Sequence, residues 1–78
     1  MERSESYKGY VLRAEPVEID PIRWAPAVVT ERRVGGEDVK RGPYEAEGTY
    51  FKEDEAIKAS LKFGRQIVDG RHPGLPLP

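Results

Sequence analysis

The sequence predicts an α+β domain, in which a three-stranded antiparallel β-meander is followed by one C-terminal α-helix that packs on one face of the sheet. Two observations predict this order. Three stretches between residues 7 and 51 combine alternating or β-branched apolar residues with Gly and Pro boundaries, as β-strands do. One later stretch, residues 48–70, repeats its apolar residues at helical spacing. A chain of 78 residues corresponds to one domain.

The first two strands are expected over residues 7–15 and 23–34. In the first strand, every second residue from Tyr10 is apolar and lies on one face of the sheet. A proline ends this strand, and residues 16–22 are expected to form a connection. In the second strand, Pro26 has no N–H to donate, so a bulge or an edge position is expected there.

A hairpin turn at residues 35–38 leads to the third strand, which is expected over residues 39–41. A Gly-Pro pair then interrupts it, and residues 44–51 are expected to resume the strand and lead into the helix. Trp24 and Val28 of the second strand are expected to pack under the helix; the alternative is an outer recognition patch.

Three segments follow from this order. Residues 1–6 are polar and are expected to be a flexible N-terminus. Residues 7–70 form the single β-β-β-α domain. Residues 71–78 are rich in proline and are expected to form a flexible tail.

The helix is expected to begin near the acidic run of residues 53–55, whose negative charge complements the unpaired N–H groups of the first turn. Its N-cap position holds Lys52 or Glu53 rather than a good capping residue. It is expected to end at Asp69-Gly70, where glycine can adopt the left-handed conformation.

The apolar arc of this helix spans roughly 200°, which is wider than the usual stripe of a surface helix. One sector holds Ala56, Ala59, Phe63 and Ile67, and the adjoining sector holds Ile57, Leu61 and Val68, with Ser60 and Gly64 between them. Either the chain's own sheet covers both sectors, or a second subunit covers one of them. The second alternative predicts a homodimer, or binding of another protein, through the partner-binding residues Ile57, Leu61, Gly64 and Val68.

Charge and composition argue against several classes of function. With 13 basic and 14 acidic residues, the net charge of −1 argues against a dedicated nucleic-acid or membrane-surface protein. No apolar run is long enough to cross a membrane, and the N-terminal residues do not form a secretory signal, so a cytoplasmic location is expected. Without cysteine there is no disulfide and no thiolate metal site.

A basic patch is the strongest candidate for a polar binding surface. The hairpin is expected to bring together Arg32, Arg33, Lys40 and Arg41. Acidic residues in the same hairpin cancel much of this charge, and the acidic start of the helix would repel phosphates. Nucleic-acid binding is therefore kept only as an alternative.

Catalysis is poorly supported. His72 is the single histidine, it lies in the tail, and no serine is near it in sequence. No phosphate-binding loop or metal-binding spacing occurs in the chain. We therefore expect a non-enzymatic protein with no catalytic residues, no cofactor and no metal.

The motifs resemble a group of small uncharacterised bacterial proteins. These motifs are Tyr7-Lys8-Gly9-Tyr10, Trp24, Phe51 followed by Asp54-Glu55-Ala56, and the residues FGRQIVDG at 63–70. The group shares the pattern Y-x-G-Y, W, F-x-x-x-E-E-A and F-G-R-x-I-I-D-G, and this chain departs from it where Lys52 and Glu53 replace a Thr or Ser cap. The resemblance carries no assigned activity.

At the level of fold alone, the strand order is also similar to HicB-type antitoxin domains. The sequence thus predicts a non-enzymatic protein-interaction domain that self-associates. The alternative is a nucleic-acid-associated or antitoxin-like regulatory module.

Overall fold

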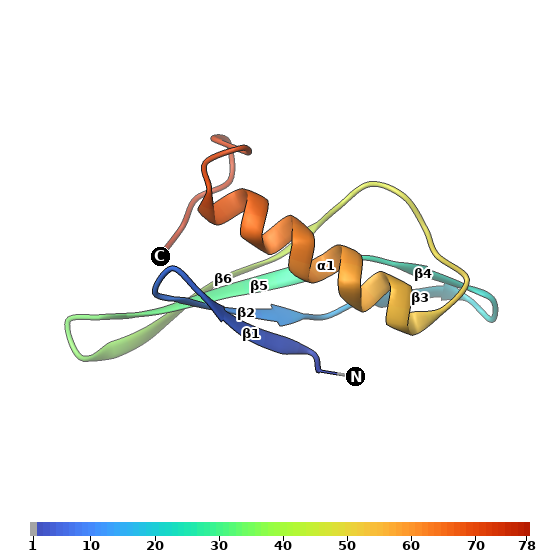
Figure 1. Cartoon of the computed structure of the whole chain (residues 1–78), viewed down its shortest axis with the longest axis horizontal. Coiled ribbons are helices and arrows are strands. Elements are labelled where there is room, and N and C mark those ends of the chain that lie inside the picture. The colour runs from blue at the N-terminus through green and yellow to red at the C-terminus, as the bar shows by residue number, and fades with distance from the viewer. Residues whose placement is uncertain (1) are drawn as a thin grey trace.

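Residues 2–78, which the computed structural model describes, contain six β-strands and one α-helix (Figure 1). The larger sheet is antiparallel, with the order β1 (Ser4–Tyr7), β2 (Tyr10–Ala14), β5 (Ala27–Val34) and β6 (Glu37–Glu45). A separate two-stranded sheet pairs β3 (Val17–Asp20) with β4 (Arg23–Ala25). The helix α1 (Glu53–Val68) crosses one face of the larger sheet. The α+β class and the single C-terminal helix are confirmed, whereas the three-stranded meander is wrong.

One long hairpin, residues 10–34, accounts for most of this difference. Its register continues from the larger sheet into the smaller one, since Ala14 lies opposite Val28 and Val17 lies opposite Ala25, and it shifts near the tip, between Glu18 and Asp20. This register leaves two prolines facing each other, residues 16 and 26. Because neither has an N–H, the ladder is interrupted on both strands at one level. The expected connection at residues 16–22 therefore contains β3, and the expected second strand is divided into β4 and β5.

The N-terminus forms the edge of the larger sheet. In place of the flexible segment expected for residues 1–6, residues 4–6 belong to β1, which pairs with β2 through a tight turn at Lys8 and Gly9. Glu5 on this strand accepts a hydrogen bond from the Arg65 guanidinium of α1 at 2.8 Å. Residue 1 lies outside the described residues.

The third expected strand corresponds to β6, which is longer and bulged. The register of β6 shifts between Arg41, opposite Thr30, and Tyr44, opposite Val28, so the Gly-Pro pair between them bulges. Beyond Glu45 the expected strand does not resume, except that Tyr50 forms an isolated antiparallel bridge with Trp24.

The helix begins and ends as the sequence predicts. Lys52 is the N-cap and makes no side-chain capping bond, Asp69 is the C-cap, and Gly70 has a φ of 81°. Within residues 2–78, no helix is both long and apolar enough to cross a membrane.

Both sectors of the wide apolar arc contribute to one core. Side chains from α1, β2 and β5 form the buried cluster of Leu12, Ala14, Val28, Ile57, Leu61 and Ile67. Gly64 allows this close approach, because a Cβ atom there would lie 2.9 Å from Val28 Cγ2 and 3.1 Å from Leu12 Cδ1. The sheet of the same chain therefore covers the helix. Ala59 and Phe63 are only half-buried.

The proline-rich tail folds back rather than extending away from the domain. Leu75 and Leu77 pack against the core cluster, and Tyr44 donates its hydroxyl proton to the Pro76 carbonyl at 2.6 Å. The expectation of a free tail at residues 71–78 is corrected by these contacts.

A buried hydrogen bond joins α1 to the interrupted ladder. Ser60 Oγ accepts from the Ala27 N–H at 3.0 Å and donates to the Ala56 carbonyl at 2.7 Å. Ala27 directly follows the proline that divides β4 from β5, so the helix supplies an acceptor at the point where the ladder is broken.

We expect Gly64→Ala to destabilise the domain by about 1–3 kcal/mol, because overpacking against two buried side chains outweighs the gain of about 1 kcal/mol in helix propensity. Urea unfolding measures this difference. Lys58→Ala on the exposed helix face should change stability by less than about 0.5 kcal/mol. A more stable Gly64→Ala variant would contradict the close contact with the sheet.

We expect Ser60→Ala to cost about 1–3 kcal/mol, because it leaves the buried N–H of Ala27 without an acceptor. Amide hydrogen exchange provides a local measurement: exchange at Ala27 should accelerate more than exchange elsewhere in β5. Equal acceleration along the whole strand would show that the hydroxyl has no specific role at this position.

Candidate functional site

The predicted partner-binding residues lie in the core rather than on the surface. Ile57 and Leu61 are 2% and 8% exposed, and Gly64 is buried against the sheet. Val68 is half-buried and packs against the same cluster. This helix face therefore no longer supports a homodimer.

The predicted basic patch is divided between two faces. The register of β5 and β6 places Arg33 and Lys40 on one face of the sheet, and Arg32 and Arg41 on the other. Carboxylates pair with both members of the first set, at 3.7 Å for Arg33 with Asp38 and 3.6 Å for Lys40 with a glutamate of β5.

The second set contacts other groups of the chain. The Arg32 guanidinium lies over the Tyr10 ring, at 5.3 Å from its centroid, and Arg41 donates to a neighbouring backbone carbonyl. The four cations therefore do not form one phosphate-binding surface.

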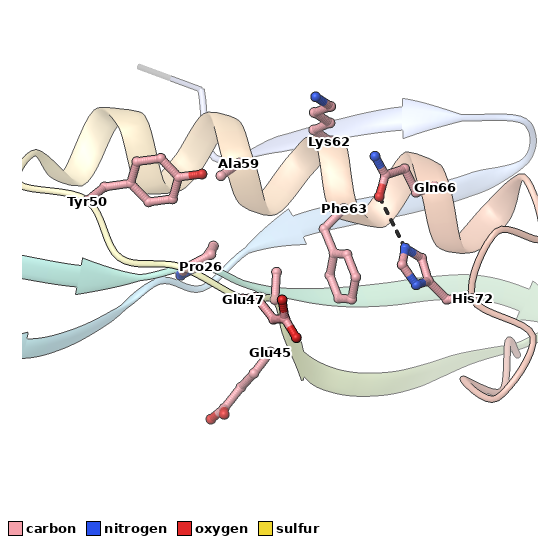
Figure 2. A pocket seen from close by; sticks show the side chains of 10 residues that line it. Pro26, Glu45, Glu47, Tyr50, Ala59, Lys62, Phe63, Gln66 and His72 are labelled. Carbon is pink, nitrogen blue, oxygen red and sulfur yellow. Dashed lines mark hydrogen bonds between the residues drawn. The ribbon is translucent and has the colours of Figure 1, made fainter.

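A shallow groove of about 470 Å³ lies between α1 and the loop that follows β6. Figure 2 shows Tyr50 at one end of the groove and His72 at the other, with Pro26, Ala59 and Phe63 between them and Glu47 near the Phe63 ring. Lys62 points away from it. The groove combines aromatic rings, an apolar floor and a carboxylate.

The chemistry of this groove is limited. His72 lies edge-on to Phe63, with ring centroids 4.8 Å apart, and its Nε2 atom is 3.1 Å from the Gln66 side-chain oxygen. The described residues that line the groove include no serine, threonine or cysteine. No group of three or more His, Asp or Glu side chains in residues 2–78 could hold a metal ion.

Exposed apolar side chains gather instead at the end of the molecule formed by β3 and β4. Val17, Ile19 and Ile22 are 48%, 52% and 63% exposed, and Phe51 is 74% exposed. Phe51 follows Tyr50, which is bridged to β4, so it belongs to the same end. We call Val17, Ile19, Ile22 and Phe51 the hairpin patch.

The strand β3 has an unpaired edge. It pairs with β4 on one side, and β4 is joined on its own far side by the bridge to Tyr50. No other segment within residues 2–78 forms a backbone hydrogen bond with the outer side of β3. Figure 1 shows the β3–β4 hairpin extending beyond the end of α1 at which the helix begins.

The two faces of β3 differ in chemistry. Val17, opposite Ala25, points to one face, and Glu18, opposite Trp24, points to the other. Asp20 accepts hydrogen bonds from Arg23 Nε at 2.8 Å and from the Ile22 N–H at 3.0 Å. The bond from Arg23, followed by the backbone bond, lowers the pKa of Asp20.

Sequence reasoning missed this surface because two prolines and a turn enclose only four strand residues. The pattern Val-Glu-Ile-Asp at residues 17–20 does alternate apolar and acidic side chains. That alternation is the pattern in the sequence that could have predicted a strand here, paired with the start of the expected second strand.

No family model, curated protein or solved structure matches the chain. The resemblance to small bacterial proteins and the similarity to HicB-type antitoxin domains therefore stay predictions.

A second polar cluster fastens the C-terminal end of α1 to the β1–β2 turn. Asp69 accepts hydrogen bonds from Lys8 Nζ at 2.6 Å and from the Tyr7 hydroxyl at 2.9 Å. The Lys8 bond, followed by the Tyr7 bond, holds the pKa of Asp69 below its ordinary value. The same Asp69 contact raises the pKa of Lys8.

These shifts predict that Asp69→Asn destabilises the domain at neutral pH. A lowered pKa means that the carboxylate stabilises the fold above its ordinary pKa of 3.8, and that this contribution is lost as the pH falls further. Urea unfolding at pH 7 and pH 3 should show a difference from wild type that shrinks on acidification. Glu47→Gln serves as an exposed control, and a difference that does not change with pH would contradict the ion pair.

Proposed function

We propose that this chain is a non-enzymatic protein-interaction domain that binds an extended segment of another polypeptide along β3. One observation carries the proposal: an unpaired strand edge lies beside the exposed hairpin patch. An open edge offers a row of backbone donors and acceptors to an added strand. Exposed apolar clusters of this kind commonly mark interaction surfaces.

The position of the hairpin supports the proposal. Beyond the facing prolines, β3 and β4 leave the larger sheet and its core. A two-stranded hairpin alone is at best marginally stable in water, whereas three or more strands with a covered apolar face are stable. A polypeptide added to β3 would supply another strand and would cover part of the hairpin patch.

The other expected functions have less support. The helix face that predicted self-association is covered by the chain's own sheet. The basic residues that favoured nucleic acid are divided between two faces and partly neutralised. No specific observation favours the nucleic-acid-associated or antitoxin-like alternative.

Site-specific photo-crosslinking in the native cell tests the proposal. A photoreactive residue replaces Ile19 in the full chain, and a matched control carries it at Lys58 on the exposed helix face. We expect a discrete crosslinked polypeptide from position 19 only, because a bound strand would lie against that side chain. The mass of the adduct distinguishes a second copy from another protein, and identical weak adducts from both positions would refute the proposal.

A further inference from the structure

We infer that the segment bound by β3 alternates lysine or arginine with apolar, preferably β-branched, residues, and that it is not a second copy of this chain. The inference rests on the proposed function and adds the chemistry of the partner. Two observations support it. The first is that one carboxylate of β3 has no ion-pair partner within residues 2–78, and the second is the identity of the residues that a pairing strand would place opposite that carboxylate.

Glu18 is the carboxylate of β3 that is available to a partner. Its side chain is exposed, and it forms no ion pair within residues 2–78. Asp20, the other acid of this strand, is already held by Arg23 at 2.8 Å and by the Ile22 N–H. The face of β3 that carries Glu18 therefore presents unpaired negative charge, while Val17 presents apolar surface on the opposite face. The register of β3 shifts between Glu18 and Asp20, so Ile19 lies in a bulge outside this alternation.

Pairing of β3 with a second copy of itself places like charges together. A two-fold symmetric pair runs antiparallel, and apolar residues meet in three registers: Ile19 opposite Ile19, Val17 opposite Ile19, or Val17 opposite Val17. In the first register Glu18 of one copy faces Asp20 of the other, and in the second it faces Glu18. Like charges directly opposite each other destabilise a strand pair, so these two registers are disfavoured. In the third register Glu18 faces a proline, which has no N–H to donate and so shortens the ladder.

A strand with the complementary pattern avoids this conflict. Lys or Arg directly opposite Glu18 forms a favourable cross-strand pair. The neighbouring residues of the same strand point to the other face, where an apolar side chain would contact Val17. Glu18 would thus serve two purposes, because it selects a basic partner and also prevents pairing between copies.

The test uses two synthetic peptides that differ only in charge, one alternating Val with Lys and the other alternating Val with Glu. Each is labelled and titrated with the full chain, and fluorescence anisotropy measures binding at low and at moderate salt. We expect wild type to bind the Lys peptide more tightly, by about five-fold or more, since a favourable pair replaces a like-charge pair. Glu18→Lys should reverse this preference.

Glu37→Lys is the matched control, because it makes the same charge change at an exposed position in the other hairpin. It should keep the wild-type preference. If wild type binds both peptides equally and Glu18→Lys changes neither affinity, the inference fails, and photo-crosslinking at position 19 decides whether binding at β3, and with it the proposed function, stands. If neither peptide binds, the inference also fails, and photo-crosslinking at position 19 decides separately whether the proposed function stands.

Sedimentation tests the second half of the inference. Wild type should be monomeric at micromolar concentration, and Glu18→Val should self-associate because the repulsion is removed. A wild-type dimer that Ile19→Lys dissociates would overturn the inference in favour of a second copy. Circular dichroism of each variant checks that these exposed substitutions leave the fold intact.

Discussion

The facing pair of Pro16 and Pro26 is the constraint on which the rest of this structure depends. A proline on one strand removes one donor from a ladder, and its neighbours can still bridge the gap. Two prolines at the same level remove the donors from both strands, so the hairpin continues in register but no longer as one sheet. The inner half joins β1 and β6 and forms the core, whereas the outer half is a two-stranded sheet that the bridge to Tyr50 and contacts between β4 and α1 connect to the rest of the domain.

The helix α1 contacts the sheet next to this interruption. Ser60 and Gly64 lie one turn apart in α1, and each meets the sheet at or near the break. The hydroxyl of Ser60 accepts the N–H of Ala27, the first residue of β5. Gly64 lets the helix backbone approach Val28 in the same strand. Both positions hold small residues, so in the sequence they separate the two apolar sectors of the helix. In the structure they are positions at which the helix contacts β5 closely.

Much of the fold could be predicted because its signals are local. The bounds of α1 follow from the acidic run of its first turn and from Gly70. Pro26 indicates an irregularity in the second strand, but the full interruption also needs Pro16 at the same level. The assignment of the wide helix arc to a partner could not be decided locally, because it depends on how many strands lie beneath the helix. The periodicity of the sequence indicates three strands, whereas the fourth, β1, lies in a polar segment at the edge of the sheet and so carries no apolar pattern.

The candidate site was missed for a related physical reason. A strand is recognised from the sequence by the apolar residues that it buries, and β3 buries none: Val17 and Ile19 are about half exposed. Its strand conformation is imposed by its partner across the hairpin, and this dependence is visible only once the register is known. The same feature is what makes β3 of interest, because an apolar strand that its own chain does not cover is normally a hazard for aggregation. The shortness of β3 and its bulge already limit pairing between copies. The unpaired carboxylate of Glu18 adds repulsion between identical copies while leaving the edge open to a strand of opposite charge.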